Sequence, residues 1–278
     1  MWGRVVRPLR TTEGFRGPSM SFAQFVERPL GVARALDQGE CGGSYAEACM
    51  LISGIISAMA SYVWPGEQID RKRFVELWVR FSGDGDAARV SVPLLIQGLL
   101  TDGRIDEAHV MKRLKPKMFG PGYDCRVVIG DEVDANEQAL ITACPSLDLA
   151  IVRRHAYPTV FYEHVRSKLV HEYGFGPDGK AVQWPMTRRT DAGVSYSNQL
   201  VNTEERVLET EDGPEVLHRH NNTRRIHFHT AWLIALTRTL AKNADERLST
   251  TPAPLTAPEW WLPNRQHRPG TPTAPSRA

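Results

Sequence analysis

The segment from Tyr45 to Val63 restricts the fold more than any other, because it is apolar on nearly all sides of a helix. A helix of this kind is stable in water only when other elements cover most of its surface. Two arrangements would provide that cover: a central position within one domain, or a position shared with a second copy of the chain. The segment is close to the lower length limit for a membrane span, but its Ser residues and Glu47 argue against one.

Both ends of this segment carry ordinary helix signals. Ser44 precedes it as an N-cap, and Glu47 follows three residues later, which is the pattern of a capping box. Trp64-Pro65-Gly66 ends it, because proline does not continue a helix. We therefore expect Glu47 to support the start of this helix.

Helical periodicity recurs along the chain, and strand-like alternation is confined to short stretches. Helices are expected at 70–81, 90–100, 105–114, 134–144 and 230–247. Short strands are expected at 126–129, 194–197 and 225–229. No strand–helix alternation suggests a parallel sheet, and no glycine-rich phosphate loop follows a strand. The sequence therefore predicts an all-α helical bundle with a small inserted β-ribbon, within a region of about 176–229.

Composition sets limits on the class of protein. The net charge of +2 is nearly balanced, so any affinity for nucleic acid has to come from a local patch. The four Cys residues show no metal-ligand spacing and indicate reduced thiols. No signal peptide or membrane-spanning stretch is recognised, and we expect a cytoplasmic protein that does not bind a membrane.

The two ends differ in composition from the helical part, which we place at 30–248. Residues 1–29 form a basic arm, either loosely ordered or in contact with RNA, with arginines at Arg4, Arg7, Arg10 and Arg16. Residues 249–278 are rich in Pro, Thr and Ala and read as a flexible tail. The pair Trp260-Trp261 within it is either a docking peptide or a patch of the tail itself.

The stretch 161–175 holds the strongest candidate for chemistry. Val165, Leu169 and Val170 give it the apolar stripe of an amphipathic helix, which also carries Arg166 and His171. Five positions place these two side chains about 140° apart and about 7.5 Å along the axis, so they can flank one substrate group. A guanidinium holds a developing oxyanion and an imidazole moves a proton near neutral pH, which suits phosphate chemistry. The plain alternative is that Arg166 pairs with Glu163 and that His171 only ends the helix.

The run Arg166-Ser-Lys-Leu-Val-His171, followed by Glu172-Tyr173, resembles the signature of the HEPN superfamily. Ribonuclease members of that family carry an Arg, four to six intervening residues and a His. The residue after the Arg is often Asn, Asp or His in active members, and this chain has Ser167 there. The resemblance extends over the helical body but is specific only at 161–175.

The resemblance implies a helical bundle that forms a homodimer and cleaves RNA without a metal or other cofactor. Arg166 would stabilise the phosphorane and His171 would move the proton, with Ser167 beside them. Such an endoribonuclease acts as a toxin or an antiviral defence effector. Tyr173 matches a position that a nucleotidyltransferase-type antitoxin modifies in HEPN toxins. A catalytically silent HEPN-type scaffold, which binds a partner or a nucleotide, is the alternative.

Two further regions offer weaker candidates. Four imidazoles at His218, His220, His227 and His229 suggest zinc, but the neighbouring arginines would repel a cation, and we expect no metal. An exposed turn is the simplest interpretation, and an RNA-facing rim is the alternative, formed by Lys168, Arg224, Arg225 and His227. The basic residues Arg71, Lys72, Arg73 and Arg80 are expected to form a solvated face rather than a phosphate contact.

Overall fold

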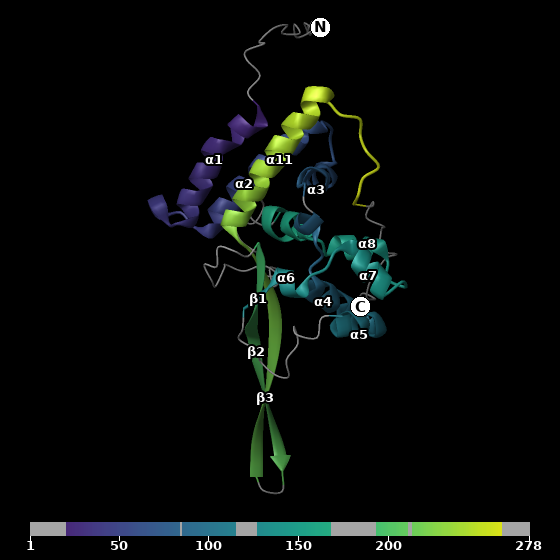
Figure 1. The fold of residues 1–278 in the computed structure, drawn as a ribbon. Helices are drawn as coiled ribbons and strands as arrows, with labels where there is room; N and C mark the ends of the chain where they lie inside the picture. The colour runs from purple at the N-terminus through teal and green to yellow at the C-terminus, as the bar shows by residue number, and fades with distance from the viewer. Residues whose placement is uncertain (1–20, 84, 115–126, 168–192, 211–212, 263–278) are drawn as a thin grey trace, which may run out of the picture.

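The computed structural model describes residues 21–83, 85–114, 127–167, 193–210 and 213–262, with the backbone alone described at 41, 86 and 198–224. This part of the chain is mostly helical and contains one three-stranded antiparallel sheet (Figure 1). Its longer helices are α1 (Phe22–Asp37), α2 (Tyr45–Val63), α3 (Asp70–Phe81), α4 (Val92–Thr101), α5 (Ile105–Leu114) and α11 (Thr230–Thr250). The shorter ones are η1 (Glu40–Gly42), η2 (Gly85–Ala88), α6 (Gly130–Val133), α7 (Glu137–Ala143), α8 (Leu149–Arg154), α9 (Tyr157–Val160) and η4 (Phe161–Arg166).

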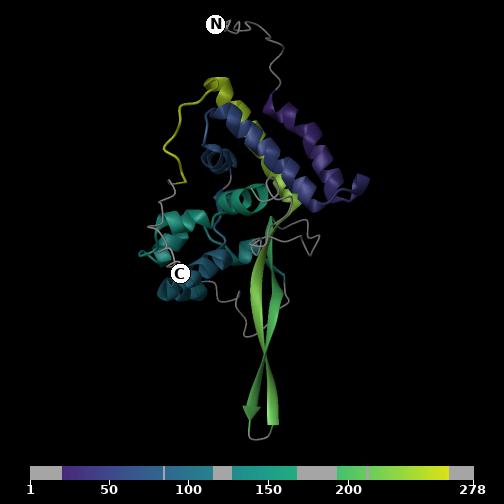
Figure 2. The ribbon, with the colours of Figure 1, turned by 180° about the vertical axis from the view of Figure 1, so that it is seen from behind.

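Helix α2 is the central helix of the body. It packs against α1, α3, α11 and η4, and ten of its residues are buried (Figure 2). The first of the two expected arrangements, a central position within the domain, is therefore confirmed, and a face shared with a second copy stays a prediction. Helix α2 is long and apolar enough to cross a membrane. Buried core helices of soluble proteins can have the same length and composition.

The predicted start of α2 is confirmed. The Ser44 hydroxyl accepts a hydrogen bond from the Ala46 N–H at 3.2 Å and donates one to the Glu47 carboxylate. Glu47 thus supports the helix terminus. The predicted bounds of α3 and α5 also agree with the structure.

Helix α1, which begins the described chain, pairs with α11, about 200 residues later. The Asp245 carboxylate on α11 accepts hydrogen bonds from the N–H groups of Phe22 and Ala23, at 2.8 and 2.9 Å. Glu27 and Arg238 form a two-point ion pair between the same helices. Since α1 begins at Phe22, the boundary expected for the basic arm at residue 29 is too late.

The sheet has the order β1 (Val128–Ile129), β2 (Val194–Thr210) and β3 (Gly213–Phe228). The three strands predicted from alternation are present, and β2 and β3 pair from Val194↔Phe228 to Thr210↔Gly213. The ribbon is therefore a long hairpin rather than a small one, and it projects from the helical body (Figure 1). The prediction of a mostly helical fold with an inserted β-ribbon is confirmed, although the hairpin is longer than expected.

A buried carboxylate holds the base of the hairpin against the helices. The Asp134 Oδ1 atom accepts the Val92 N–H at 3.0 Å. Its Oδ2 atom lies 2.7 Å from the Tyr196 hydroxyl and also accepts the Tyr157 hydroxyl. The Tyr196 hydroxyl lies 2.9 Å from Ser91 Oγ. Burial raises the pKa of Asp134 to about 7, against the lowering effect of these hydrogen bonds.

The segment after α11 packs on the body, contrary to the flexible tail expected from residue 249. Its Leu255 N–H donates to the Val63 carbonyl, and Leu262 is buried. The Trp261 N–H donates to the buried Glu76 carboxylate at 2.7 Å, and the Arg153 guanidinium lies 4.9 Å from the Trp261 ring. Trp260 contacts the ring of Trp64. The two tryptophans thus dock on the chain's own helices.

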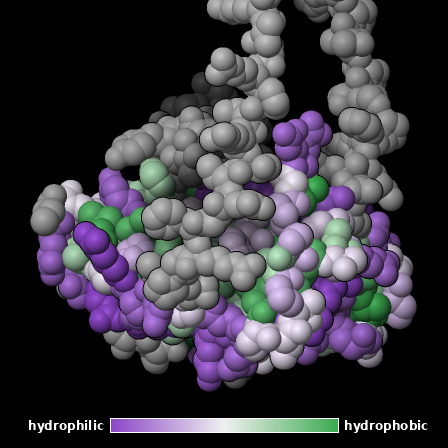
Figure 3. Space-filling view, turned by 90° about the horizontal axis from the view of Figure 1, so that it is seen from above, coloured by the Kyte–Doolittle hydropathy of each residue, from purple (hydrophilic) through white to green (hydrophobic). Residues whose placement is uncertain are grey.

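The visible part of the face seen from above, opposite the projecting hairpin, is mostly hydrophilic, with small separate hydrophobic patches (Figure 3). Scattered patches of this size are normal for a protein surface. The apolar side chains gather instead in one core, formed mainly by α2, α3, α4, α11 and η4.

Replacing Asp134 with Asn should remove a pH dependence of stability. The folded protein keeps this proton up to about pH 7, whereas the unfolded chain releases it near 3.8. The protonated group contributes its full share to the free energy of unfolding below pH 3.8. This contribution decreases as the pH rises from 3.8 and is lost once the pH has passed 7. Urea unfolding of the wild type from pH 4 to pH 7.5 should therefore show an additional loss of roughly 3 kcal/mol relative to Asp134→Asn. Parallel curves for the two proteins would contradict a neutral Asp134 in the folded state.

Candidate functional site

Arg166 lies on a helix that changes its winding. The helix begins at Tyr157 with Pro158 in its first turn, and it continues as the π-helical segment η4, with Ser167 still helical. The predicted helix is thus present over 161–167, but its turns are wider than those of an α-helix. Such π-helical turns are uncommon and often occur at functional sites. Lys168, His171 and Tyr173 lie outside the described residues.

Aromatic packing fixes this helix on the body. The Phe161 ring is fully buried, with centroids 5.4 Å from Trp78 on α3 and 5.2 Å from Phe228 on β3. Tyr162 packs edge-on against Phe74, at 5.2 Å. The π-helical segment is therefore held by side chains from α3 and from the hairpin, in the turn immediately before Arg166.

Arg166 is partly buried and is held by a tyrosine rather than by an acid. Its Nη1 atom donates to the Tyr162 hydroxyl at 3.1 Å, and the guanidinium lies 4.9 Å from the centre of that ring. Within the described residues, no carboxylate forms an ion pair with Arg166. The Glu163 carboxylate instead lies 2.5 Å from the Arg71 guanidinium. The alternative in which Arg166 pairs with Glu163 is therefore wrong.

Two further arginines reach the same region from the first turn of α3. Arg73 pairs with Asp70 and donates to the backbone carbonyls of Trp64 and Gly66. The side chains of Arg71 and Arg73 are only 20% and 14% exposed. The solvated face expected for these residues is thus wrong.

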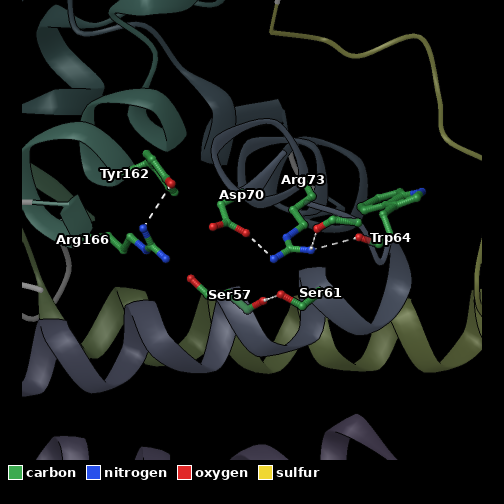
Figure 4. Close-up of polar contacts among 8 residues, drawn as sticks. Ser57, Ser61, Trp64, Asp70, Arg73, Tyr162 and Arg166 are labelled. Atoms are coloured by element: carbon green, nitrogen blue, oxygen red, sulfur yellow. Dashed lines mark hydrogen bonds and ion pairs between the residues drawn. The ribbon is translucent and has the colours of Figure 1, made fainter. Parts of the chain in front are cut away.

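Figure 4 places Arg166, Tyr162, Asp70 and Arg73 on the same side of α2, with Ser57 below them. The Ser57 hydroxyl is buried, points toward Arg166, and has no hydrogen-bond partner within the described residues. We refer to Arg166, Tyr162, Asp70, Arg71, Arg73 and Ser57 as the Arg166 cluster.

The charges of the cluster act on the Tyr162 hydroxyl. Burial raises the pKa of this phenol, and the nearby Asp70 acts in the same direction. Arg166 is the largest opposing influence, followed by Arg71 and Arg73. The hydroxyl is therefore a neutral donor and acceptor close to Arg166.

The cluster has the chemistry of an anion site. The carboxylates of Asp70 and Glu163 offset two of the three guanidinium groups, which leaves one positive charge in excess. The planar fork of a guanidinium matches the oxygens of a phosphate, and Arg166 makes only one hydrogen bond within the described residues. An anionic group at Arg166 would also have the Ser57 hydroxyl as a donor.

Sequence reasoning assigned Arg71 and Arg73 to a solvated face in preference to a phosphate contact, and it did not single out Tyr162. A signal was present, since basic residues in the first turn of a helix oppose the helix dipole. Such a local conflict indicates either specific acidic partners or a function. The partner Glu163 lies far along the chain from Arg71, so sequence spacing did not identify the pair.

The other predicted site residues lie away from the cluster. Glu47 caps the start of α2, ten residues before Ser57 and thus about 15 Å away along the axis. Ser167 is partly buried and continues the helix after Arg166. Arg224 lies on β3 with its side chain outside the described part, and Arg225 is partly buried, which lowers the pKa of its guanidinium.

His227 lies neither in the expected exposed turn nor in the alternative RNA-facing rim. Its side chain is fully buried, and Nε2 lies 2.8 Å from Ser197 Oγ. His229 is also buried and lies 2.9 Å from Ser195 Oγ. Both imidazoles therefore help to fix the base of the hairpin. Within the described part of the chain, no three His, Cys, Asp or Glu side chains gather as metal ligands.

Comparison of the chain with protein-family models, with curated proteins and with solved structures finds no match in any of the three.

Substitution of Arg166 by Ala should change stability little. The residue loses one hydrogen bond and one partly exposed cation–π contact, each worth about 0.5–1.5 kcal/mol. Urea unfolding should show a free energy of unfolding within about 2 kcal/mol of the wild type. Arg71→Ala should cost more, because it leaves the partly buried Glu163 without that ion pair. The opposite order would mean that Arg166 has a structural role.

Proposed function

We propose that this protein is a metal-independent endoribonuclease of HEPN type. The observation that carries the proposal is the state of Arg166: a partly buried guanidinium, on a π-helical turn, without a carboxylate partner in the described part of the chain. The sequence continues from this helix to His171 with the Arg-x4-His spacing. A cation that is positioned but not neutralised favours a role in binding an anion over a structural role.

The reaction follows from the chemistry of the two groups. The ribose 2′-oxygen attacks the adjacent phosphorus, and the bond from phosphorus to the 5′-oxygen breaks. The 2′-hydroxyl proton leaves to a base, and the departing 5′-oxygen receives a proton, so that a 2′,3′-cyclic phosphate and a 5′-hydroxyl result. His171 would move a proton in this exchange, a contribution of typically 10²–10⁴-fold in rate. Arg166 would bind the charged phosphorane oxygens.

The Arg166 cluster suggests how the phosphate would be held. The Arg166 fork provides the permanent charge, and the Ser57 hydroxyl and the Tyr162 hydroxyl provide neighbouring polar groups. Arg71 and Arg73 raise the local positive potential while being held by Glu163 and Asp70. Because the overall charge of the chain is nearly balanced, such a local concentration is what RNA binding requires.

A homodimer, as the family resemblance implies, would bring a second Arg166 and His171 to the same site. The partners that we propose are therefore RNA and a second copy of the chain, in a cytoplasmic toxin or antiviral effector. A catalytically silent scaffold, which would retain the same helices, is the alternative.

Cleavage of end-labelled single-stranded RNA in the presence of EDTA tests the proposal. The wild type should cut the RNA and leave cyclic-phosphate ends, and Arg166→Ala and His171→Ala should each reduce the rate at least 100-fold. Arg113→Ala and His109→Ala are matched controls, because both residues are exposed on α5, and they should cut at the wild-type rate. An RNA with one 2′-deoxyribose at the cleaved position should resist cutting there.

The same experiment separates the alternatives. If all variants and the wild type are inert while remaining folded, the scaffold interpretation replaces the nuclease. If EDTA abolishes cutting, the metal-independent mechanism is wrong.

Regulation of this site through Tyr173 is testable by mass spectrometry. Protein produced together with its neighbouring genes should carry a nucleotide adduct on Tyr173, and Tyr173→Phe should carry none. An unmodified Tyr173 under these conditions would remove the support for a nucleotidyltransferase-type antitoxin.

A further inference from the structure

A surface pocket lies beside the C-terminal segment, on the side of Trp64 away from the Arg166 cluster. The ends of α2, α3 and α11 and residues 251–258 border a half-open pocket of about 410 Å³. In both ribbon views the segment after α11 runs past α3 toward α8 (Figures 1 and 2), and its residues Thr251, Leu255, Thr256 and Pro258 form one wall of the pocket. A volume of this size lies within the roughly 300–1,000 Å³ typical of small-molecule sites.

The charged residues that line this cavity are both arginines, Arg80 and Arg247. Arg247 is exposed, and its guanidinium makes no ion pair within the described residues. Arg80 pairs with the buried Glu76 carboxylate, which offsets its charge, so the excess positive charge of the lining comes from Arg247. The lining therefore carries a net positive charge and favours an anionic ligand.

The Trp64 indole is a buried donor without an acceptor. Its side chain is 3% exposed, and the Nε1 atom has no hydrogen-bond partner within the described residues. Figure 4 shows the indole nitrogen at the end of the side chain that points away from Arg166, toward the C-terminal segment. A buried N–H group without a partner is unfavourable and rare in native proteins, so an acceptor from outside the chain is expected at this position.

The remaining lining supplies hydroxyls and an apolar floor. Thr251 and Thr256 add two hydroxyl groups, and Phe81 and Leu255 add apolar surface. With the two guanidinium groups and the indole, five donor groups line one cavity. A phosphate monoester presents three terminal oxygens to such donors, whereas a carboxylate presents two.

We propose that this cavity binds a small phosphate monoester of mononucleotide size, with its phosphate at Arg247 and an acceptor atom at the Trp64 indole. The apolar part of the ligand lies on Phe81 and Leu255. The site is separate from the Arg166 cluster, and it does not depend on ribonuclease activity. Because residues 251–258 form one wall, occupancy also stabilises the docked C-terminal segment.

The indole region of the ¹H–¹⁵N spectrum of the full chain provides the test. The chain has seven tryptophans, and the resonance that disappears in Trp64→Phe identifies the Trp64 indole. AMP and UMP, added separately, should shift this resonance downfield and saturably, whereas adenosine should not. Arg247→Ala should raise the dissociation constant at least tenfold.

Two control variants make the outcome specific. Arg154→Ala removes an exposed arginine of α8 and should leave the titration unchanged. Arg166→Ala should also leave it unchanged, so that failure of the nuclease proposal and failure of this one are distinguishable. A Trp64 resonance that both nucleotides leave unmoved would overturn the proposal and indicate that an ordered water satisfies the indole. An equal response in Arg247→Ala, or to adenosine, would overturn it as well.

Discussion

The contacts of the Phe161 ring hold together the parts of the molecule that matter for its proposed chemistry. This ring meets Phe74 and Trp78 of α3 and Phe228 of β3, and so joins η4, a core helix and the hairpin. Buried aromatic rings contribute large apolar areas and prefer defined relative orientations. The helix that carries Arg166 is therefore positioned by packing, and its polar side does not need ion pairs to keep it in place.

Charge balance around α3 explains why Arg166 differs from its neighbours. The first turn of α3 contains three basic residues in a position where the helix dipole is unfavourable to them. Asp70 and Glu163 offset Arg73 and Arg71, and two backbone carbonyls near the end of α2 accept from Arg73. Because Asp70 and Glu163 form their ion pairs with Arg73 and Arg71, the hydrogen bond of Arg166 goes to the phenol of Tyr162. Its positive charge is thereby available to an anion.

Much of the helical body could be predicted from the sequence, because its signals are local. Periodic apolar residues and N-cap residues define α2, α3 and α5, and alternation defines the paired ends of β2 and β3. The π-helical winding of η4 could not be predicted, since a six-residue segment is too short to show its own period. The length of the hairpin was also missed, because polar strand residues beyond its base carry no burial pattern.

The candidate site was predictable only at Arg166. The pair of Arg71 with Glu163 depends on two elements that are distant in sequence, and no local pattern encodes such a contact. His227 looked exposed because its neighbours are basic, but both faces of the hairpin are buried at its base. Composition likewise suggested a free tail, whereas specific contacts of Trp261 with Glu76 and Arg153 dock it.

The packing of α1 on α11 affects the order in which the protein can fold during synthesis. The N–H groups that begin α1 find their acceptor on Asp245, more than 200 residues later in the chain. During synthesis, α1 and α2 therefore leave the ribosome well before the helix that completes their packing. The contacts of α1 and α2 with each other and of α2 with α3 can form early, but the part of their apolar surface that α11 covers stays open until that helix has been made.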